Sequence, residues 1–278
     1  MQRVSAESWR LDPRHLQLTV GELAWSAYHR VGHDDGWNRA VWFEAGEPVA
    51  WAWLTRPASL EWQVRPDRPE AADRVVAWFE EEAEAAERHV GVRAANRPGR
   101  EALERRGYDP RPNAPFMVLN TIDLSGLAEP RLPPGYRLTN LAETPDVERR
   151  VEVHRAAFHP SRVTNESYGN VMAHAWPYRP DLDCVVVAPD GSFASYALGW
   201  LDRSNRTGEL EPVGTHPEHR RRGLATAVSH YALQRLRDAG AETGIVGCRG
   251  DDDYPAPKRV YESIGFRELT RTIPYAKS

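Results

Sequence analysis

Residues 209–226 read Glu-Leu-Glu-Pro-Val-Gly-Thr-His-Pro-Glu-His-Arg-Arg-Arg-Gly-Leu-Ala-Thr, and this stretch decides the fold. Its first part alternates, with Leu210 facing one way and Glu209 and Glu211 the other, which is typical of a β-strand. After a basic corner, apolar residues follow at helical spacing: Leu224, Val228, Tyr231, Leu233 and Leu236. The stretch therefore predicts a strand, a short loop and a long amphipathic helix.

The basic corner has the features of a phosphate-binding loop. The first amides of a helix have no partner inside the helix, and the helix dipole places positive charge at that end. Gly223 lets the backbone approach a ligand closely, and residues 220–222 are three arginines. The corner thus predicts an anion site, with an ordinary basic turn at a helix start as the alternative interpretation.

Two motifs resemble those of the GNAT N-acyltransferase superfamily. Arg220-x-x-Gly223-x-Ala225, between a strand and a long helix, is similar to its acyl-CoA pyrophosphate loop. About forty residues later, Tyr261-Glu-Ser-Ile-Gly-Phe266 is similar to the end of its later Asn-x-x-Ala-x-x-x-Tyr-x-x-x-Gly-Phe motif. The family's Asn falls at Tyr254 here, so this contact departs from the pattern.

The resemblance implies acetyl-CoA as co-substrate, a small primary amine as acceptor and no metal. Carried over position by position, it implies the following cofactor-binding residues: Val213, Gly214, Thr215, Arg220, Arg221, Arg222, Gly223, Leu224, Ala225, Thr226 and Tyr254. The backbone at Val213 would polarise the acetyl carbonyl as an oxyanion hole does.

The chemistry of acyl transfer points to three catalytic candidates. An alkyl ammonium must lose a proton before it attacks a thioester, and a carboxylate at the pocket accepts that proton. Glu209 and Glu211 lie on one face of the predicted strand, and the sequence does not choose between them. The resemblance makes Tyr261 the acid that protonates the departing thiolate.

A second interpretation assigns the chain to another class of protein, one without catalytic activity. A non-catalytic CoA-binding regulatory or sensor protein would keep the phosphate loop, while Glu209, Glu211 and Tyr261 served structure alone. Loss of turnover without loss of CoA affinity in Tyr261→Phe would favour the enzyme.

Composition narrows the class of protein. The chain has 278 residues and a net charge of -4, so no global basic field indicates nucleic acid. No apolar stretch is long enough to span a membrane, and the two cysteines stand apart. These features predict a cytoplasmic protein without a membrane or nucleic-acid partner, as a monomer or homodimer.

The two halves of the chain repeat one order of elements. Each reads strand, strand, strand, long helix, strand, short helix, strand, and the proline-rich segment 125–135 separates them. We therefore expect an α/β (α+β) fold of two tandem GNAT domains, similar to the arrangement of mycothiol synthase-like members. Each domain would be a mixed, mostly antiparallel sheet flanked by helices. Residues 1–124 form the first domain and residues 136–278 the catalytic one.

The first half differs where the cofactor would bind. Its counterpart of the phosphate loop, Arg65–Asp73, has no glycine and carries three carboxylates. Leu103 stands where the later motif has its tyrosine. A pyrophosphate would meet like charge and a backbone without the required freedom. We expect the first half to keep the fold and to lack the cofactor site, with another mode of CoA binding as the alternative.

Other polar and aromatic clusters are weaker candidates. The pairs His216/His219 and His29/His33 have no third ligand nearby, which disfavours a metal. Residues 251–253 are three aspartates in a solvated loop or, less favoured, a cation-recognition site. Trp176 lies where the family builds its acceptor wall, although core packing explains it equally well. The tryptophans of the first half alternate in strands, which first of all indicates a core: Trp42, Trp51, Trp53, Trp62 and Trp78.

Overall fold

The computed structural model describes residues 1–29 and 37–278, and the predicted order of elements is confirmed in both halves. In the first half the elements are α1 (Gln2–Leu11), η1 (Pro13–His15), α2 (Val20–Tyr28), β1 (Trp37–Glu44), β2 (Glu47–Thr55), β3 (Ser59–Val64), α3 (Ala71–Glu82), β4 (Arg88–Arg93), α4 (Arg97–Arg105), β5 (Asp109–Pro110) and β6 (Met117–Asp123). In the second half they are β7 (Arg137–Asn140), α5 (Val147–Ala157), α6 (Asn165–His174), η2 (Pro180–Leu182), β8 (Asp183–Val187), β9 (Phe193–Asp202), β10 (Thr207–Thr215), η3 (Pro217–His219), α7 (Leu224–Asp238), β11 (Thr243–Arg249), α8 (Ala256–Ile264) and β12 (Arg267–Lys277).

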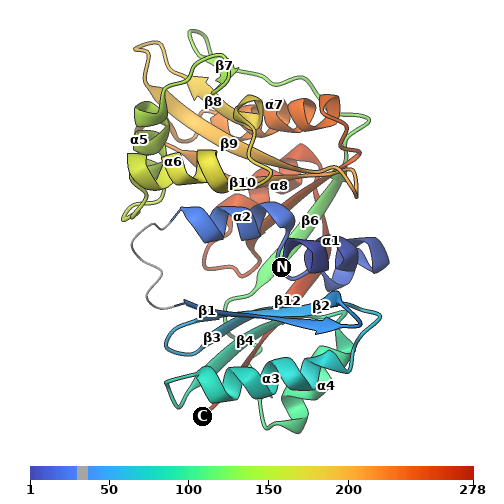
Figure 1. Ribbon diagram of the computed structural model, residues 1–278. Coiled ribbons are helices and arrows are strands. Elements are labelled where there is room, and N and C mark those ends of the chain that lie inside the picture. Colours follow the sequence, from blue (N-terminus) through green and yellow to red (C-terminus); the bar gives the residue numbers. More distant parts are fainter. Residues whose placement is uncertain (30–36) are drawn as a thin grey trace.

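The fold class is also confirmed, because each half is a mixed sheet flanked by helices (Figure 1). Only β3–β4 and β10–β11 are parallel pairs among the described strands, and the other pairs are antiparallel. Helices α1 and α2 lie between the two halves in Figure 1, with α3 and α4 on the far side of the first sheet.

The two halves exchange strands, which the sequence did not predict. The order across the sheet is β1-β2-β3-β4-β12-β6-β11-β10-β9-β8-β7. The long strand β12 pairs with β6 through residues 267–271 and with β4 through residues 272–277. Strand β6, predicted to close the first unit, pairs with β11 of the second. Because the sheet is continuous through both halves, the domain limits at residues 124 and 136 stay a prediction.

Three large buried clusters hold the sheets to their helices. One lies between α7, α8 and the second-half strands, and another lies between α2, α5, α6 and the opposite face of those strands. The third packs α3 and α4 on the first half. Trp51, Trp53 and Trp62 are buried, which confirms the core interpretation for them, while Trp42 and Trp78 are partly buried and pack edge to face.

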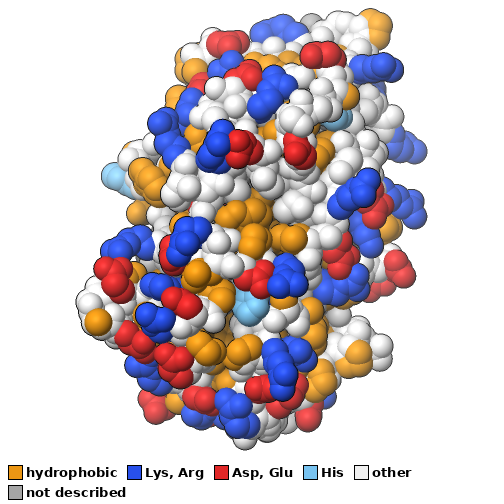
Figure 2. Space-filling view, turned by 90° about the vertical axis from the view of Figure 1, so that its right-hand side faces the viewer, with side chains coloured by type: hydrophobic (Ala, Val, Ile, Leu, Met, Phe, Trp, Pro, Cys, Tyr) orange, Lys and Arg blue, Asp and Glu red, His pale blue; other side chains and the backbone are white. Residues whose placement is uncertain are grey.

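Some boundaries differ from those predicted. The acidic amphipathic pattern of residues 69–87 predicts a helix over that range, but α3 begins at Ala71 and ends at Glu82, where the backbone becomes extended at Ala83. The apolar spacing from Leu16 to Tyr28 predicts a helix, and the structure has α2 there, although α2 begins only at Val20. Helix α1, before the 3₁₀ turn that begins at Pro13, was not predicted. On the face shown in Figure 2, basic and acidic side chains are interspersed. In the described part of the chain, no helix has both the length and the apolar character to cross a membrane.

Candidate active site

A gap opens in the sheet of the second half where its two central strands separate. The parallel pairing of β10 with β11 ends at Glu209 and Ile245, although both strands continue. On its other edge β10 stays paired with β9, with a register shift between Leu210 and Val213. Beside Val213 and Gly214 the free edge of β10 therefore faces the gap, where its backbone groups are available to a ligand.

The predicted phosphate loop lies after the gap, at the start of α7. Gly223 is the N-cap of this helix and has φ +75°, a conformation that favours glycine. Among the described residues, the amides of residues 222–226 donate to no backbone acceptor, and Gly223 supplies no side-chain cap. Arg220 and Arg222 hydrogen-bond to neutral oxygens, the Thr215 carbonyl and the Tyr136 hydroxyl. The loop thus presents open amides and positive charge at one place.

Tyr261 lies on the α7–α8 side of the gap. It comes from α8, is 8% exposed, and packs edge to face on Phe266 with 5.8 Å between ring centroids. Burial, with a smaller contribution from the Glu211 carboxylate, raises the pKa of Tyr261 far above its usual value. The phenol therefore keeps its proton at neutral pH and is able to donate it.

Glu209 faces the other side of the sheet and is tied to helix α2 of the first half. Its carboxylate accepts a hydrogen bond from the Thr19 hydroxyl and another, at 3.2 Å, from the Glu22 amide. Thr19 is also the N-cap of α2. Burial raises the pKa of Glu209 to about 8, against these hydrogen bonds and with a further increase from Glu211. Glu209 thus acts as a second acceptor at the N-terminus of α2 and joins the two halves.

Glu211 lies on the same face but has a different environment. No donor among the described residues hydrogen-bonds its carboxylate, and burial raises its pKa to about 7. Its backbone carbonyl accepts from the Trp200 indole at 2.6 Å, which fixes the strand at this point. The carboxylate borders a cavity of about 470 Å³, lined by Trp25, His29, His154, Phe158, Pro160, Ser161, Arg162, Val163, Glu211 and Pro212. Of the two predicted carboxylates, Glu211 is the one that faces an open space.

A buried polar network fixes the floor of this cavity. His154 bonds the Tyr196 hydroxyl at 2.7 Å, and burial lowers the pKa of His154 to about 3, so its ring is neutral. Behind it, Arg150 and Asp183 form a fully buried ion pair at 2.8 Å, and the Arg150 guanidinium lies 3.6 Å from the centroid of the Tyr196 ring. These contacts hold the strands and α5 in fixed relation.

The first half has a corresponding pair of strands, but its gap is filled by the protein itself. The parallel pairing of β3 with β4 ends at Leu60 and Val90. The segment 15–17 enters beside the separating strands. Gln63 accepts from the Gln17 amide at 2.7 Å and donates to the His15 carbonyl at 3.1 Å.

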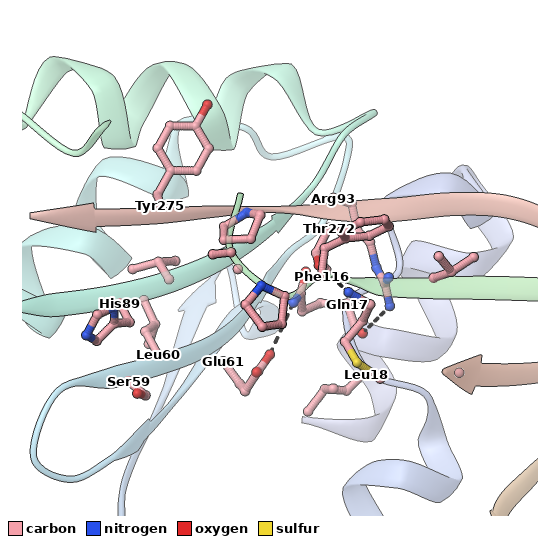
Figure 3. A pocket seen from close by; sticks show the side chains of 18 of the residues that line it. Gln17, Leu18, Ser59, Leu60, Glu61, His89, Arg93, Phe116, Thr272 and Tyr275 are labelled. Atoms are coloured by element: carbon pink, nitrogen blue, oxygen red, sulfur yellow. Dashed lines mark hydrogen bonds between the residues drawn. The ribbon is translucent and has the colours of Figure 1, made fainter. Parts of the chain in front are cut away.

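Arg93 of β4 contacts the same segment, residues 15–17, from the other side. It donates to the Leu16 carbonyl at 2.6 Å and to the Gln17 carbonyl at 2.8 Å. Gln17 lies between Glu61 and Arg93, and its amide group donates to Glu61 at 3.1 Å (Figure 3). A cavity of about 470 Å³ remains beside this segment, and on β4 the Gly91 carbonyl accepts from the Trp62 indole at 3.1 Å.

The loop that follows β3 also differs from its counterpart. Asp67 binds the Arg65 and Arg68 side chains, so the positive charge at this turn is neutralised within the protein. Glu70 is the N-cap of α3, without a side-chain hydrogen bond to the helix. The expected absence of a cofactor site here stays a prediction, supported by both the filled gap and the acidic turn.

The remaining sequence candidates lie apart from the gap or have structural partners. Among the described residues, no group of three or more His, Cys, Asp or Glu side chains is placed to hold a metal, and His33 lies outside those residues. His219 bonds the Tyr136 hydroxyl at 2.9 Å. Asp251 pairs with Arg249 at 2.5 Å, Tyr254 is 54% exposed, and Trp176 is 67% exposed. Core packing is therefore the wrong interpretation of Trp176.

Sequence reasoning missed the residues that the first half brings to the site. Thr19, Glu22 and Trp25 of the α2 region approach Glu209, Glu211 and the cavity from a position about 190 residues earlier in the chain. The Thr19-x-x-Glu22 pattern of a capping box was a signal for the helix start, but nothing local indicated its partner.

Comparisons with known proteins agree with this architecture. Residues 149–266 match the model of the Acetyltransferase (GNAT) family. A mycothiol acetyltransferase of Saccharomonospora viridis is 28% identical over 163 residues, which cover 54% of this chain and 51% of that protein. One from Nocardiopsis dassonvillei is 32% identical over 107 residues, covering 36% and 32%. The chain thus spans about half or less of the length of these relatives.

Solved structures match over nearly the whole chain. A GCN5-related N-acetyltransferase from Sphaerobacter thermophilus aligns with a TM-score of 0.68 at 21% identity, covering 99% of this chain and 90% of that one. A tandem GNAT protein from the clavulanic acid biosynthesis pathway aligns with a TM-score of 0.66 at 15% identity, covering 99% and 93%. At these identities the likeness concerns the fold alone.

The fold defined by the two pairs of diverging parallel strands is that of N-acetyltransferases, present twice in one chain. Residues 149–266 match the acetyltransferase (GNAT) family, and the whole chain shares the fold of the solved tandem GNAT protein.

Proposed function

We propose that the protein transfers an acetyl group from acetyl-CoA to the primary amine of a small molecule, in the second half of the chain. The observation that carries the proposal is the gap between β10 and β11, with Glu211 on one face of the sheet and Tyr261 on the other. The family match over residues 149–266 supports acetyl-CoA as the donor, and the names of the relatives support acetyl as the group transferred.

The loop at Gly223 would bind the pyrophosphate of acetyl-CoA through its open amides and its three arginines. The pantetheine arm would then enter the gap beside Val213, where the free edge of β10 is available to the thioester carbonyl. The acceptor would approach from the face of the sheet that carries Glu211, where the cavity lies.

In the proposed reaction Glu211 is the proton acceptor and Tyr261 is the proton donor. Glu211 accepts a proton from the acceptor ammonium, and the neutral nitrogen attacks the thioester carbonyl carbon. The tetrahedral intermediate collapses with cleavage of the C–S bond, and the departing thiolate takes the phenolic proton of Tyr261. The nitrogen then gives up its second proton, which passes through solvent to the Tyr261 phenolate, so that the amide and the neutral phenol remain. We assign the base to Glu211, since Glu209 is 5% exposed and its carboxylate is engaged by Thr19 and the Glu22 amide.

The substitution Tyr261→Phe tests the enzymatic function against the regulatory one. We expect a fall in kcat of about a hundredfold or more with an unchanged dissociation constant for acetyl-CoA, because the phenyl ring keeps its packing and loses only the acid. Single-turnover kinetics and calorimetric titration measure the two quantities. Unchanged kcat in Tyr261→Phe and in the double variant Glu209→Gln/Glu211→Gln would instead favour a non-catalytic CoA-binding protein.

A further inference from the structure

The cavity beside Glu211 combines contributions from both halves of the chain. Trp25 and His29 come from the end of α2 in the first half, whereas His154, Phe158 and Arg162 come from α5 and the segment after it. Glu211 borders it from β10. Its volume of about 470 Å³ is suited to a small molecule.

Two charged side chains of opposite sign border this cavity, and neither has a hydrogen-bond or ion-pair partner among the described residues. The Glu211 carboxylate is half-buried beside the gap and receives no hydrogen bond from a described residue. Arg162 is exposed, and neither an ion pair nor a hydrogen bond joins its guanidinium to the described part of the chain. The neighbouring Arg155, by contrast, donates to the Val163 carbonyl at 3.0 Å. Within residues 1–29 and 37–278, Arg162 is therefore an unpaired cation at the rim of the cavity.

The walls between these two charges are flat and largely apolar. Trp25 stacks on His29 with 4.8 Å between ring centroids, and His154 stacks on Phe158 at 5.1 Å. Burial keeps the His154 ring neutral, with a pKa lowered to about 3, so the His154–Phe158 part of the wall adds no charge of its own. A ligand in the cavity would thus meet an anion beside the gap, aromatic surface along its body and a cation at the rim.

We propose that the acceptor is an amine whose other end carries a carboxylate or a phosphate, with the amine against Glu211 and the anion against Arg162. The proposal rests on the acetyl-transfer function and adds the chemical class of its substrate. A guanidinium without a protein partner binds either anion through its planar fork of N–H donors, so the two anions share one mode of recognition. Binding at Arg162 would also orient the amine toward the thioester.

Matched amines with and without the anion test this proposal. 4-(Aminomethyl)benzoate and benzylamine differ by a carboxylate at the end opposite the amine, while phosphoethanolamine and ethanolamine differ by a phosphate. With the wild-type protein, we expect a lower KM for the anionic member of at least one pair. In Arg162→Gln we expect that KM to rise about tenfold, as for the loss of a charge-assisted hydrogen bond. The KM of its partner without the anion should stay within about twofold.

The control is Arg203→Gln, which removes an exposed arginine outside the cavity and should leave every KM unchanged. The charge reversal Arg162→Glu should invert the preference within the pair. Equal changes in KM for both members of a pair, or no change in either, would overturn the proposal while leaving acetyl transfer intact. Absence of transfer to any amine, with acetyl-CoA bound, would overturn the proposed function and this inference together.

Discussion

The two halves of the chain contain the same strand arrangement but use it differently. In the second half it lies between β10 and β11, and in the first half between β3 and β4. In both, a short parallel pairing ends and the strands separate. In the second half the free edge of β10 faces a gap that a basic loop follows. In the first half, residues 15–17 occupy the separation and bind Gln63 and Arg93. The same backbone geometry thus yields a candidate site in one half and an internal packing contact in the other.

The comparison also shows how the first half contributes to the site of the second. The segment that fills the first gap continues into α2, and the N-terminus of α2 holds Glu209. One stretch of fewer than thirty residues thus fills one gap and forms a wall of the cavity beside the other. We infer that the first half serves as a fixed support and as part of the acceptor wall.

The largest expected effect comes from comparing one carboxylate substitution in each half of the chain. Glu211→Gln should lower kcat by about a hundredfold or more, whereas Glu61→Gln, on β3 of the first half, should leave kcat within about twofold. Both carboxyls are half-buried and have a raised pKa, so the pair separates a catalytic role from burial alone.

The pH dependence of kcat/KM gives a second test of Glu211→Gln. Burial raises the pKa of Glu211 to about 7, and only the ionised form accepts a proton. In the wild type kcat/KM should therefore rise with pH and level off above about 7, and Glu211→Gln should lose this rise. A rise that persists in Glu211→Gln and disappears in Glu209→Gln would transfer the role of base to Glu209.

A smaller effect is expected from loosening the filled gap. Arg93→Gln removes the donors that bind the Leu16 and Gln17 carbonyls, so the free energy of unfolding should fall by roughly 2–3 kcal/mol. Arg88→Gln on the same strand, where the guanidinium bonds the Ala86 carbonyl, is the control and should cost less than about 1 kcal/mol. Urea denaturation measures both, and equal losses would show that Arg93 has no special part in closing the gap.

The smallest expected effect concerns the link through α2. Thr19→Ala removes the N-cap of α2 and one donor to Glu209, and should lower the free energy of unfolding by about 1–2 kcal/mol. Thr164→Ala removes the N-cap of α6, a side chain that accepts from the Ser167 amide and not from a residue at Glu209 or Glu211, and should cost about 1 kcal/mol. Both should keep kcat within about twofold, and a fall in Thr19→Ala as large as that in Glu211→Gln would contradict the structural role of Glu209.

Much of the fold could be predicted from the sequence because its signals are local. The alternation of Glu209, Leu210 and Glu211 and the apolar spacing after Gly223 reflect the periods of a strand and a helix. The exchange of β6 and β12 could not be predicted, since strand pairing depends on contacts between distant segments.

The candidate site, too, could be predicted from the sequence only in part. Its loop and Tyr261 belong to motifs that a single stretch displays. The choice between Glu209 and Glu211, by contrast, depends on Thr19, about 190 residues away, which engages one carboxylate and leaves the other open. Arg162 carries no motif, and its position at the cavity becomes visible only when α2 and α5 are placed together.

Calorimetric titration of acetyl-CoA tests most directly the claim that one half alone binds the cofactor. The wild type should bind at one site per chain, and Gly223→Glu should abolish binding by placing a carboxylate in the phosphate loop. Gly240→Glu is the matched control at the other end of α7, because both glycines have a positive φ and open space around an added Cβ. It should bind as the wild type does. Two sites per chain, or binding that survives Gly223→Glu, would contradict the assignment of the cofactor to the second half.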